Sequence, residues 1–149
     1  MIEITSLIKP TKITFKKVEA EWYSYHNTLK EIARLREEIM NPFEEEPDDK
    51  TIIKGANSVR DIDKPTERIA TRLATHKQLR YLQEVTDAIE QVYNALPDEY
   101  KTLVRLRYWN KNKKQTWEGI ALKLNVSERQ ARRWRDEIIQ ATVELLGWR

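Results

Sequence analysis

The sequence predicts an all-α fold, in which a long antiparallel helical hairpin precedes a small C-terminal helix-turn-helix domain. Three observations predict it. The 149 residues include only three glycines and five prolines, which leaves little turn chemistry for a sheet of many strands. Apolar residues recur at helical spacings over two long stretches. Charged residues make up 34% of the chain, as expected where helices expose polar faces to water.

The first long helix is predicted from apolar residues that recur every three or four positions. This spacing places them on one stripe of a helix of about seven turns. We expect Thr14 to cap the helix and Pro42 to end it. The residues of the stripe are Phe15, Val18, Trp22, Tyr25, Leu29, Ile32, Leu35 and Ile39.

An acidic linker is expected next, over residues 41–63. It contains Pro42, Pro47 and Gly55, which disfavour regular structure. Residues 37–49 contain seven acidic residues and no lysine or arginine. A run of like charges is most simply a solvated segment.

The second long helix is predicted to start near Asp63 and Pro65. Its apolar stripe is weaker where His76 and Lys77 interrupt it. Two long amphipathic helices joined by a linker are most simply an antiparallel hairpin, which we assign to residues 1–96. The stripe consists of Ile69, Leu73, Leu82, Val85, Ile89, Val92 and Leu96.

A two-helix hairpin leaves much of each apolar stripe half exposed, so we expect it to pack on a second copy as a homo-oligomer. The competing interpretation is that the stripes pack only within their own chain. A sedimentation measurement on residues 1–97 separates the two. The residues expected at the interface between copies are Trp22, Tyr25, Leu29, Ile32, Leu82, Val85 and Ile89.

The C-terminal domain, residues 97–149, contains the pattern of a helix-turn-helix. A helix that includes Tyr100 and Tyr108 is followed by a basic loop, and Thr116 is expected to cap a short helix. We interpret Gly119 in that helix as a point of close approach between helices. The turn Asn125-Val126-Ser127 follows, with asparagine at the left-handed position and a buried valine.

The last helix is expected to begin at a capping box formed by Ser127 and Gln130. One face of this helix is predicted to lie in the core, and the opposite face carries arginines. Its inward residues are expected to be Ala131, Trp134, Ile138 and Leu145.

Charge is distributed unevenly along the chain. The overall formal charge is only +3, but residues 101–149 hold twelve lysines and arginines against five acidic residues, which gives +7. The first hundred residues therefore carry −4. This asymmetry predicts a basic end that meets a polyanion.

The arginine face of the last helix is of the type that binds double-stranded DNA in the major groove. Guanidinium groups pair with guanine edges or phosphates, and glutamine pairs with adenine. The alternative is an ordinary solvated face with pairs such as Arg132–Asp136 or Arg133–Glu137. The residues expected to read bases are Glu128, Arg129, Gln130, Arg132 and Arg133. Those expected to contact phosphates are Lys111, Lys113, Lys114, Gln115, Thr116, Ser127 and Arg135.

Other function classes receive little support. The chain has no cysteine, its two histidines fall on different predicted helices, and its three glycines form no phosphate-binding loop. We therefore expect no catalytic residues, no metal and no cofactor. No apolar run is long enough to cross a membrane, so we expect a cytoplasmic protein, associated with the nucleoid when it is bound to DNA.

From residue 96 onward the chain resembles the fourth region of bacterial sigma factors. The resemblance rests on Leu96-Pro97, on Leu106-Arg107-Tyr108, on residues 116–121 and 124–127, and on Ala131-Arg132-Arg133. The upstream half is similar to the RinA-like family of phage transcriptional activators. That similarity is carried by Tyr25-His26 with Leu29, by residues 35–43, by Pro65-Thr66-Glu67 and by residues 89–93.

The resemblance implies a phage or prophage activator of late genes for capsid assembly and DNA packaging, placed beside host RNA polymerase at a promoter. It assigns Arg129, Gln130, Arg132 and Arg133 to the DNA-reading helix. Two alternatives stay open. A small terminase-like packaging protein also joins a helix-turn-helix to oligomerising helices, and a helical adaptor would meet acidic protein with its arginine face instead of DNA.

Overall fold

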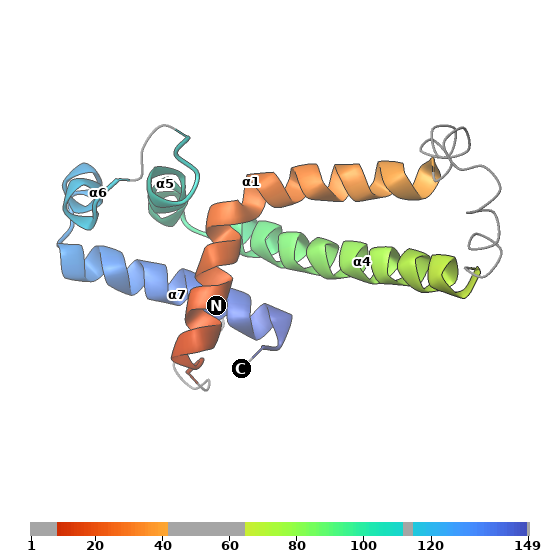
Figure 1. The fold of residues 1–149 in the computed structure, drawn as a ribbon. Coiled ribbons are helices and arrows are strands. Elements are labelled where there is room, and N and C mark those ends of the chain that lie inside the picture. Colours follow the sequence, from red (N-terminus) through yellow and green to blue (C-terminus); the bar gives the residue numbers. More distant parts are fainter. Residues whose placement is uncertain (1–8, 42–64, 112–114, 149) are drawn as a thin grey trace. The chain divides into compact units, whose positions relative to one another are not determined.

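The computed structural model describes residues 9–41, 65–111 and 115–148, and within them every regular element is a helix. The all-α class is therefore confirmed. The acidic linker from residue 42 on, and Lys113 and Lys114, lie outside the described residues. The helices, in the order shown in Figure 1, are α1 (Lys12–Met40), α4 (Pro65–Ala95), α5 (Asp98–Arg107), α6 (Trp117–Leu124) and α7 (Glu128–Leu146).

The starts of the two long helices follow different signals. α4 begins at Pro65, where a proline suits the first helical position because its missing N–H is not needed there. The predicted cap of α1 is wrong by three residues. The helix begins at Lys12, and the hydroxyl oxygen of Thr11 accepts a hydrogen bond from the backbone N–H of Thr14 at 3.1 Å. The antiparallel hairpin itself stays a prediction.

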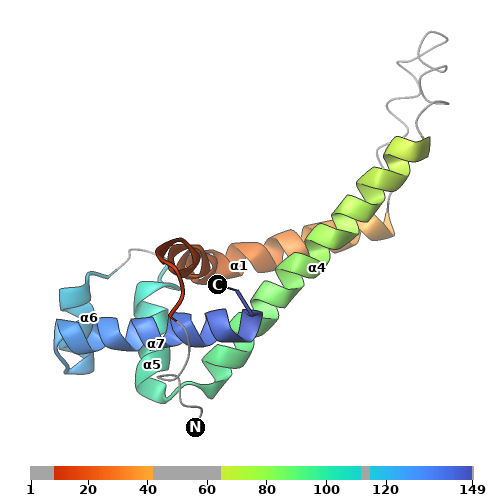
Figure 2. The ribbon, with the colours of Figure 1, turned by 90° about the horizontal axis from the view of Figure 1, so that it is seen from below.

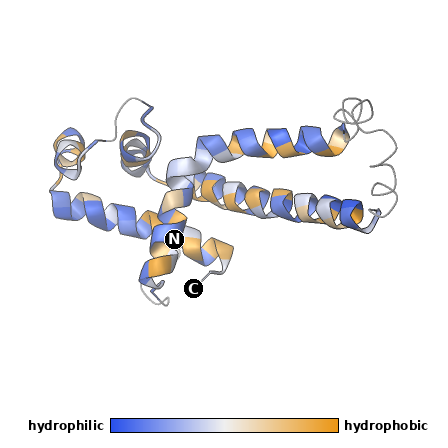
Figure 3. Cartoon of the chain, in the orientation of Figure 1, coloured by the Kyte–Doolittle hydropathy of each residue, from blue (hydrophilic) through white to orange (hydrophobic). Residues whose placement is uncertain are grey.

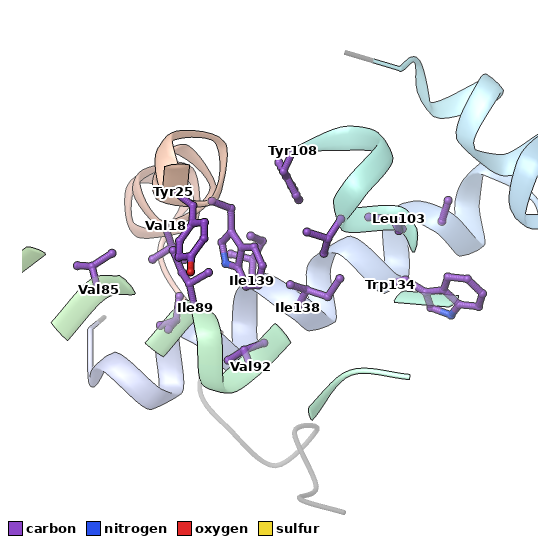
Figure 4. Close-up of a cluster of buried hydrophobic side chains, with 14 of the residues drawn as sticks. Val18, Tyr25, Val85, Ile89, Val92, Leu103, Tyr108, Trp134, Ile138 and Ile139 are labelled. Atoms are coloured by element: carbon purple, nitrogen blue, oxygen red, sulfur yellow. The ribbon is translucent and has the colours of Figure 1, made fainter. Parts of the chain in front are cut away.

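One compact unit consists of residues 1–27 and 84–149. Within it, α5, α6 and α7 pack against one another, as the two views in Figures 1 and 2 show. Its core also takes in the beginning of α1 and the end of α4, through the fully buried residues Val18, Trp22 and Ile89. Val18 and Ile89 belong to the same buried cluster as Leu103 and Ile138 (Figure 4). This division differs from the expected boundary at residue 96, because the apolar residues of α1 and α4 share one core with those of α7.

The prediction of an interface between copies is wrong for most of its residues, because they are already covered within a single chain. Five of the seven are at most 9% exposed, and Leu82 is half-buried. Only Leu29, with 37% exposed, belongs to the exposed class. The oligomeric state itself stays a prediction. The five buried residues are Trp22, Tyr25, Ile32, Val85 and Ile89.

Trp22 is the largest side chain that is fully buried in this unit. Its indole N–H donates a hydrogen bond to the hydroxyl of Thr142 on α7, with 3.0 Å between the two atoms. Trp109 stacks on Trp22 with 5.9 Å between ring centroids and donates its own indole N–H to the Trp22 carbonyl oxygen. The indole groups thus have their polar atoms satisfied in the core, as buried tryptophan requires.

Buried tyrosines predict how stability depends on pH. Tyr108 is 5% exposed and donates a hydrogen bond to the Glu19 carboxylate, at 2.8 Å. Burial, and next the charge of Glu19, raise the pKa of the Tyr108 hydroxyl above its ordinary value of about 10. Above that pH the unfolded chain loses a proton that the folded chain keeps, so the free energy of unfolding falls as pH rises.

We therefore expect Tyr108→Phe to make this alkaline loss of stability less steep. Urea unfolding at a series of pH values from neutral to alkaline measures it. Equal pH dependence in wild type and Tyr108→Phe would contradict the assignment.

The second compact unit consists of residues 28–83. On α1, Ile32 and Leu35 are buried, as the apolar stripe predicts. On α4, by contrast, Ile69 and Leu73 are 59% and 63% exposed, and residues 65–74 are all exposed. The predicted apolar stripe of α4 is therefore buried only in its second half. No helix in the described ranges is long and apolar enough to cross a membrane.

Candidate nucleic-acid interface

The predicted turn between α6 and α7 is confirmed in its backbone. Asn125 adopts the left-handed conformation with φ 61° and ψ 44°. The next N–H, that of Val126, donates to the carbonyl oxygen of Ala121 at 3.0 Å, which closes α6 with the hydrogen bond of a Schellman motif. Val126, expected to be buried, is half-buried and packs against the core. The turn thereby fixes where α7 begins.

The hydroxyl groups at the two helix starts act as caps. The Ser127 oxygen accepts a hydrogen bond from the backbone N–H of Gln130 at 3.0 Å, and the Thr116 oxygen accepts one from Gly119 at 3.1 Å. Both capping residues are exposed. A hydroxyl that also binds a phosphate would have to share or lose its hydrogen bond to the helix backbone. The main structural role of Ser127 and Thr116 is therefore to cap the first turns of α7 and α6.

The expectation for Gly119 is wrong. A Cβ atom at this position would lie 3.3 Å from side-chain oxygens of Gln115 and Thr116, and it would meet no atom of α7 within 4 Å. The crowding is local to the start of α6, because the capping hydroxyl lies over the glycine. The residue does not mark a close approach between the two helices.

Removal of the α7 cap should destabilise the unit. We expect Ser127→Ala to lower the free energy of unfolding by about 1 kcal/mol, since one N–H at the start of α7 loses its acceptor. Thermal unfolding followed by circular dichroism measures the change. Ser127→Asp keeps an acceptor and is the control. A melting temperature unchanged in the alanine variant would show that the cap contributes nothing.

The exposed face of α7 forms an arginine stripe, which we define as Glu128, Arg129, Arg132, Arg133 and Asp136. At 100° per residue these five positions fall on one side of the helix, and they line the same stretch of surface. Figure 3 shows that hydrophilic residues prevail along this first part of α7. The stripe therefore gathers the predicted base-reading residues, apart from half-buried Gln130.

The arginines of the stripe differ in their ion pairs. Arg132 lies 3.5 Å from the carboxylate of Glu128, an exposed pair of little energetic weight. Arg129 and Arg133 pair with no carboxylate in the described part of the chain. The pair between Arg133 and Glu137 that the solvated-face alternative offers is not present. The Glu137 carboxylate instead accepts a hydrogen bond from the Tyr100 hydroxyl at 2.6 Å.

Arg135 has a different environment from the stripe, and its predicted phosphate contact is not supported. Its side chain is only 20% exposed. The guanidinium group donates to Asp136 at 2.6 Å and to Glu19 of α1 at 3.3 Å, and it lies 5.1 Å from the ring centre of Trp117. The guanidinium group of Arg135 is therefore already bound by two carboxylates and stacked near an aromatic ring. Through Glu19 it links α7 to α1 within this unit.

Arg107 on α5 is a positioning residue that sequence reasoning missed. Its guanidinium group donates to the carbonyl oxygen of Gln115 at 2.7 Å and to the hydroxyl of Tyr23 at 3.0 Å. It also lies 4.6 Å from the ring centre of Trp117, on which Arg135 rests as well. These contacts hold the segment that leads into α6. The one sequence signal was an arginine between the apolar residues Leu106 and Tyr108.

The remaining predicted phosphate contacts lie before α6. Lys111 is exposed, and Gln115 is half-buried with its carbonyl oxygen bound by Arg107. Across the described ranges, no group of three or more histidine, cysteine, aspartate or glutamate side chains has the arrangement of a metal site. The groups that this surface offers for binding are the cations of Lys111 and the arginine stripe, and the side-chain amide of Gln115.

Comparisons with known proteins support a relationship over most of the chain. The model of a family described as "Protein of unknown function (DUF722)" matches residues 21–144. A curated relative, the "Transcriptional activator rinA" of Staphylococcus phage phi11, is 28% identical over 134 residues, which cover 90% of this chain and 91% of the relative. No solved structure was found to match the chain.

Proposed function

This chain belongs to the DUF722 family and is RinA-like, and from that membership we propose that it is a sequence-specific, double-stranded DNA-binding transcriptional activator of phage genes. The similarity to the phage phi11 activator extends over nearly the whole of both chains, so it supports the same class of function for the whole protein. No role in catalysis is proposed.

The observation that carries this proposal is a pair of arginines, Arg129 and Arg133, on the exposed face of α7 directly after the turn. Neither has an ion pair among the described residues. A guanidinium group that pairs with no carboxylate can bind guanine O6 and N7 in bidentate fashion. Residues in the first turns of the second helix are the ones that reach base edges in helix-turn-helix proteins. Arg132 can bind a base in the same way once its exposed ion pair with Glu128 is broken.

The other polar groups have supporting roles in this proposal. Gln130, in the first turn of α7, is suited to pair with adenine, and Glu128 to accept from cytosine. Lys111 and the exposed caps Thr116 and Ser127 lie at the edges of the same motif and are assigned to phosphates. Such contacts fix the register on the duplex and carry no sequence information.

The resemblance to RinA-like activators extends the proposal to the genes that are regulated. We assign the chain to the activation of late genes for capsid structure and DNA packaging. Host RNA polymerase at the promoter is the proposed second partner. A homo-oligomer would give the two-fold symmetric contact that helix-turn-helix proteins commonly use.

Selection of bound duplexes from random DNA, together with the mass of the complex, tests the proposal. We expect enrichment of one short motif, either single or repeated, and a complex with few copies of the chain. Enrichment of a site with a ring of many copies would instead indicate a packaging protein. Failure to enrich any sequence would overturn sequence-specific recognition.

A further inference from the structure

A second basic surface lies on α4, away from the helix-turn-helix motif in sequence. Arg68, Arg72, His76 and Arg80 follow one another at intervals of four residues, and all four are exposed. Each step of four residues advances about 6 Å along a helix and turns about 40°, so the four side chains form one ridge about 18 Å long. We call these four residues the α4 ridge.

Within the described residues, the α4 ridge lies in a stretch with an excess of positive charge. Between positions 65 and 83 the chain has a single acidic residue, Glu67, against three arginines of the ridge and Lys77 beside it. The three arginines of the ridge and Lys77 form no ion pair with a carboxylate of the described residues. α1 offers a contrast in the same compact unit, since Arg34 there is bound by Glu31 at 2.7 Å and by Glu38 at 3.0 Å.

We propose that the α4 ridge binds the phosphate backbone of duplex DNA outside the base pairs that α7 reads, an inference that rests on the proposed function. A row of cations without acidic residues between them matches a surface that carries one negative charge for about every 1.7 Å of its length. Arginine is the side chain best suited to grip phosphate through two donors. Over about 18 Å the ridge can follow roughly five base pairs of one strand.

Two other partners fit the α4 ridge less well. A second copy would meet it in a symmetric interface, which places the same patch of each subunit against the other and so brings like charges together. Single-stranded nucleic acid is bound mainly by large aromatic side chains on which bases stack, and residues 65–80 contain no phenylalanine, tyrosine or tryptophan. Binding to the backbone of duplex DNA requires only positive charge, which the α4 ridge has.

The salt dependence of binding to a long random-sequence duplex tests the inference on the full chain. In Arg72→Ala/Arg80→Ala, the slope of log affinity against log salt should become shallower by about 1.8, since each lost phosphate contact removes about 0.9. Alanine is at least as good a helix former as arginine, so α4 should be kept, which circular dichroism checks. Lys30→Ala/Arg36→Ala on α1 removes the same charge from exposed positions and should leave the slope unchanged.

The outcomes distinguish DNA binding by the α4 ridge from DNA binding by α7. A steep slope in the wild type that stays the same in Arg72→Ala/Arg80→Ala overturns the inference and leaves DNA binding by α7 standing. An unchanged slope with an altered mass of the free protein would assign the ridge to contacts between copies. A flat slope already in the wild type would reject the proposed function itself.

Discussion

Arg133→Ala is expected to weaken binding to the selected duplex by about 10- to 100-fold, while binding to a random duplex falls much less. The reason is that one bidentate arginine–guanine contact discriminates by about 1–3 kcal/mol, whereas its share of the general attraction to phosphates is small. Arg133 is the sharpest choice because it is exposed, lies on the arginine stripe and pairs with no carboxylate in the described ranges. Fluorescence anisotropy with both duplexes measures the two affinities.

Two control variants identify what Arg133 contributes. Arg133→Lys keeps the charge and loses the planar fork, so it should restore binding to random DNA without restoring the preference for the selected site. Arg36→Ala removes an exposed arginine from α1 and should change neither affinity appreciably. Equal losses of Arg133→Ala on selected and random DNA would assign this residue to a phosphate contact instead of a base.

The largest effect on stability is expected for Trp22→Ala, at about 3–5 kcal/mol of unfolding free energy. Trp22 is completely buried, and its removal leaves a large cavity in the core cluster to which Ile89 and Ile138 also belong. The variant also loses the hydrogen bond from the indole N–H to Thr142. Urea unfolding followed by circular dichroism gives the change.

Ile69→Ala is the control for this second variant, because its side chain is 59% exposed and the substitution should cost about 0.5 kcal/mol or less. If the free energy of unfolding falls by less than about 1 kcal/mol in Trp22→Ala, then α1 does not belong to the core that supports α7. If it falls as expected, the proposed DNA binding should be lost with it, since the start of α1 and helices α5 to α7 then fold as one unit.

The features that sequence reasoning predicted well are those encoded by neighbouring residues. The left-handed turn at Asn125 and the cap of α7 by Ser127 depend on side chains within three or four positions of the groups they satisfy. The same holds for the start of α4 at Pro65. Local signals of this kind need no knowledge of the rest of the fold.

The features that it could not predict depend on which helices share a core. The spacing of Trp22 shows that the residue lies on an apolar stripe, but its partner Thr142 is 120 positions away. The stripe alone therefore could not distinguish burial within the chain from burial against a second copy. The environment of Arg135 could not be predicted for the same reason, since only the approach of Glu19 from α1 shows that its charge is already paired.

The most direct test of DNA recognition by α7 is the affinity of the wild-type chain for the selected duplex across a series of salt concentrations. We predict that log affinity falls linearly with log salt, by about 0.9 for each phosphate contact, so that several contacts give a steep line. We also predict that the preference for the selected over the random duplex persists across the series, because base contacts carry it. A flat salt response, or equal affinity for both duplexes at every salt concentration, would contradict recognition of DNA by the arginine stripe.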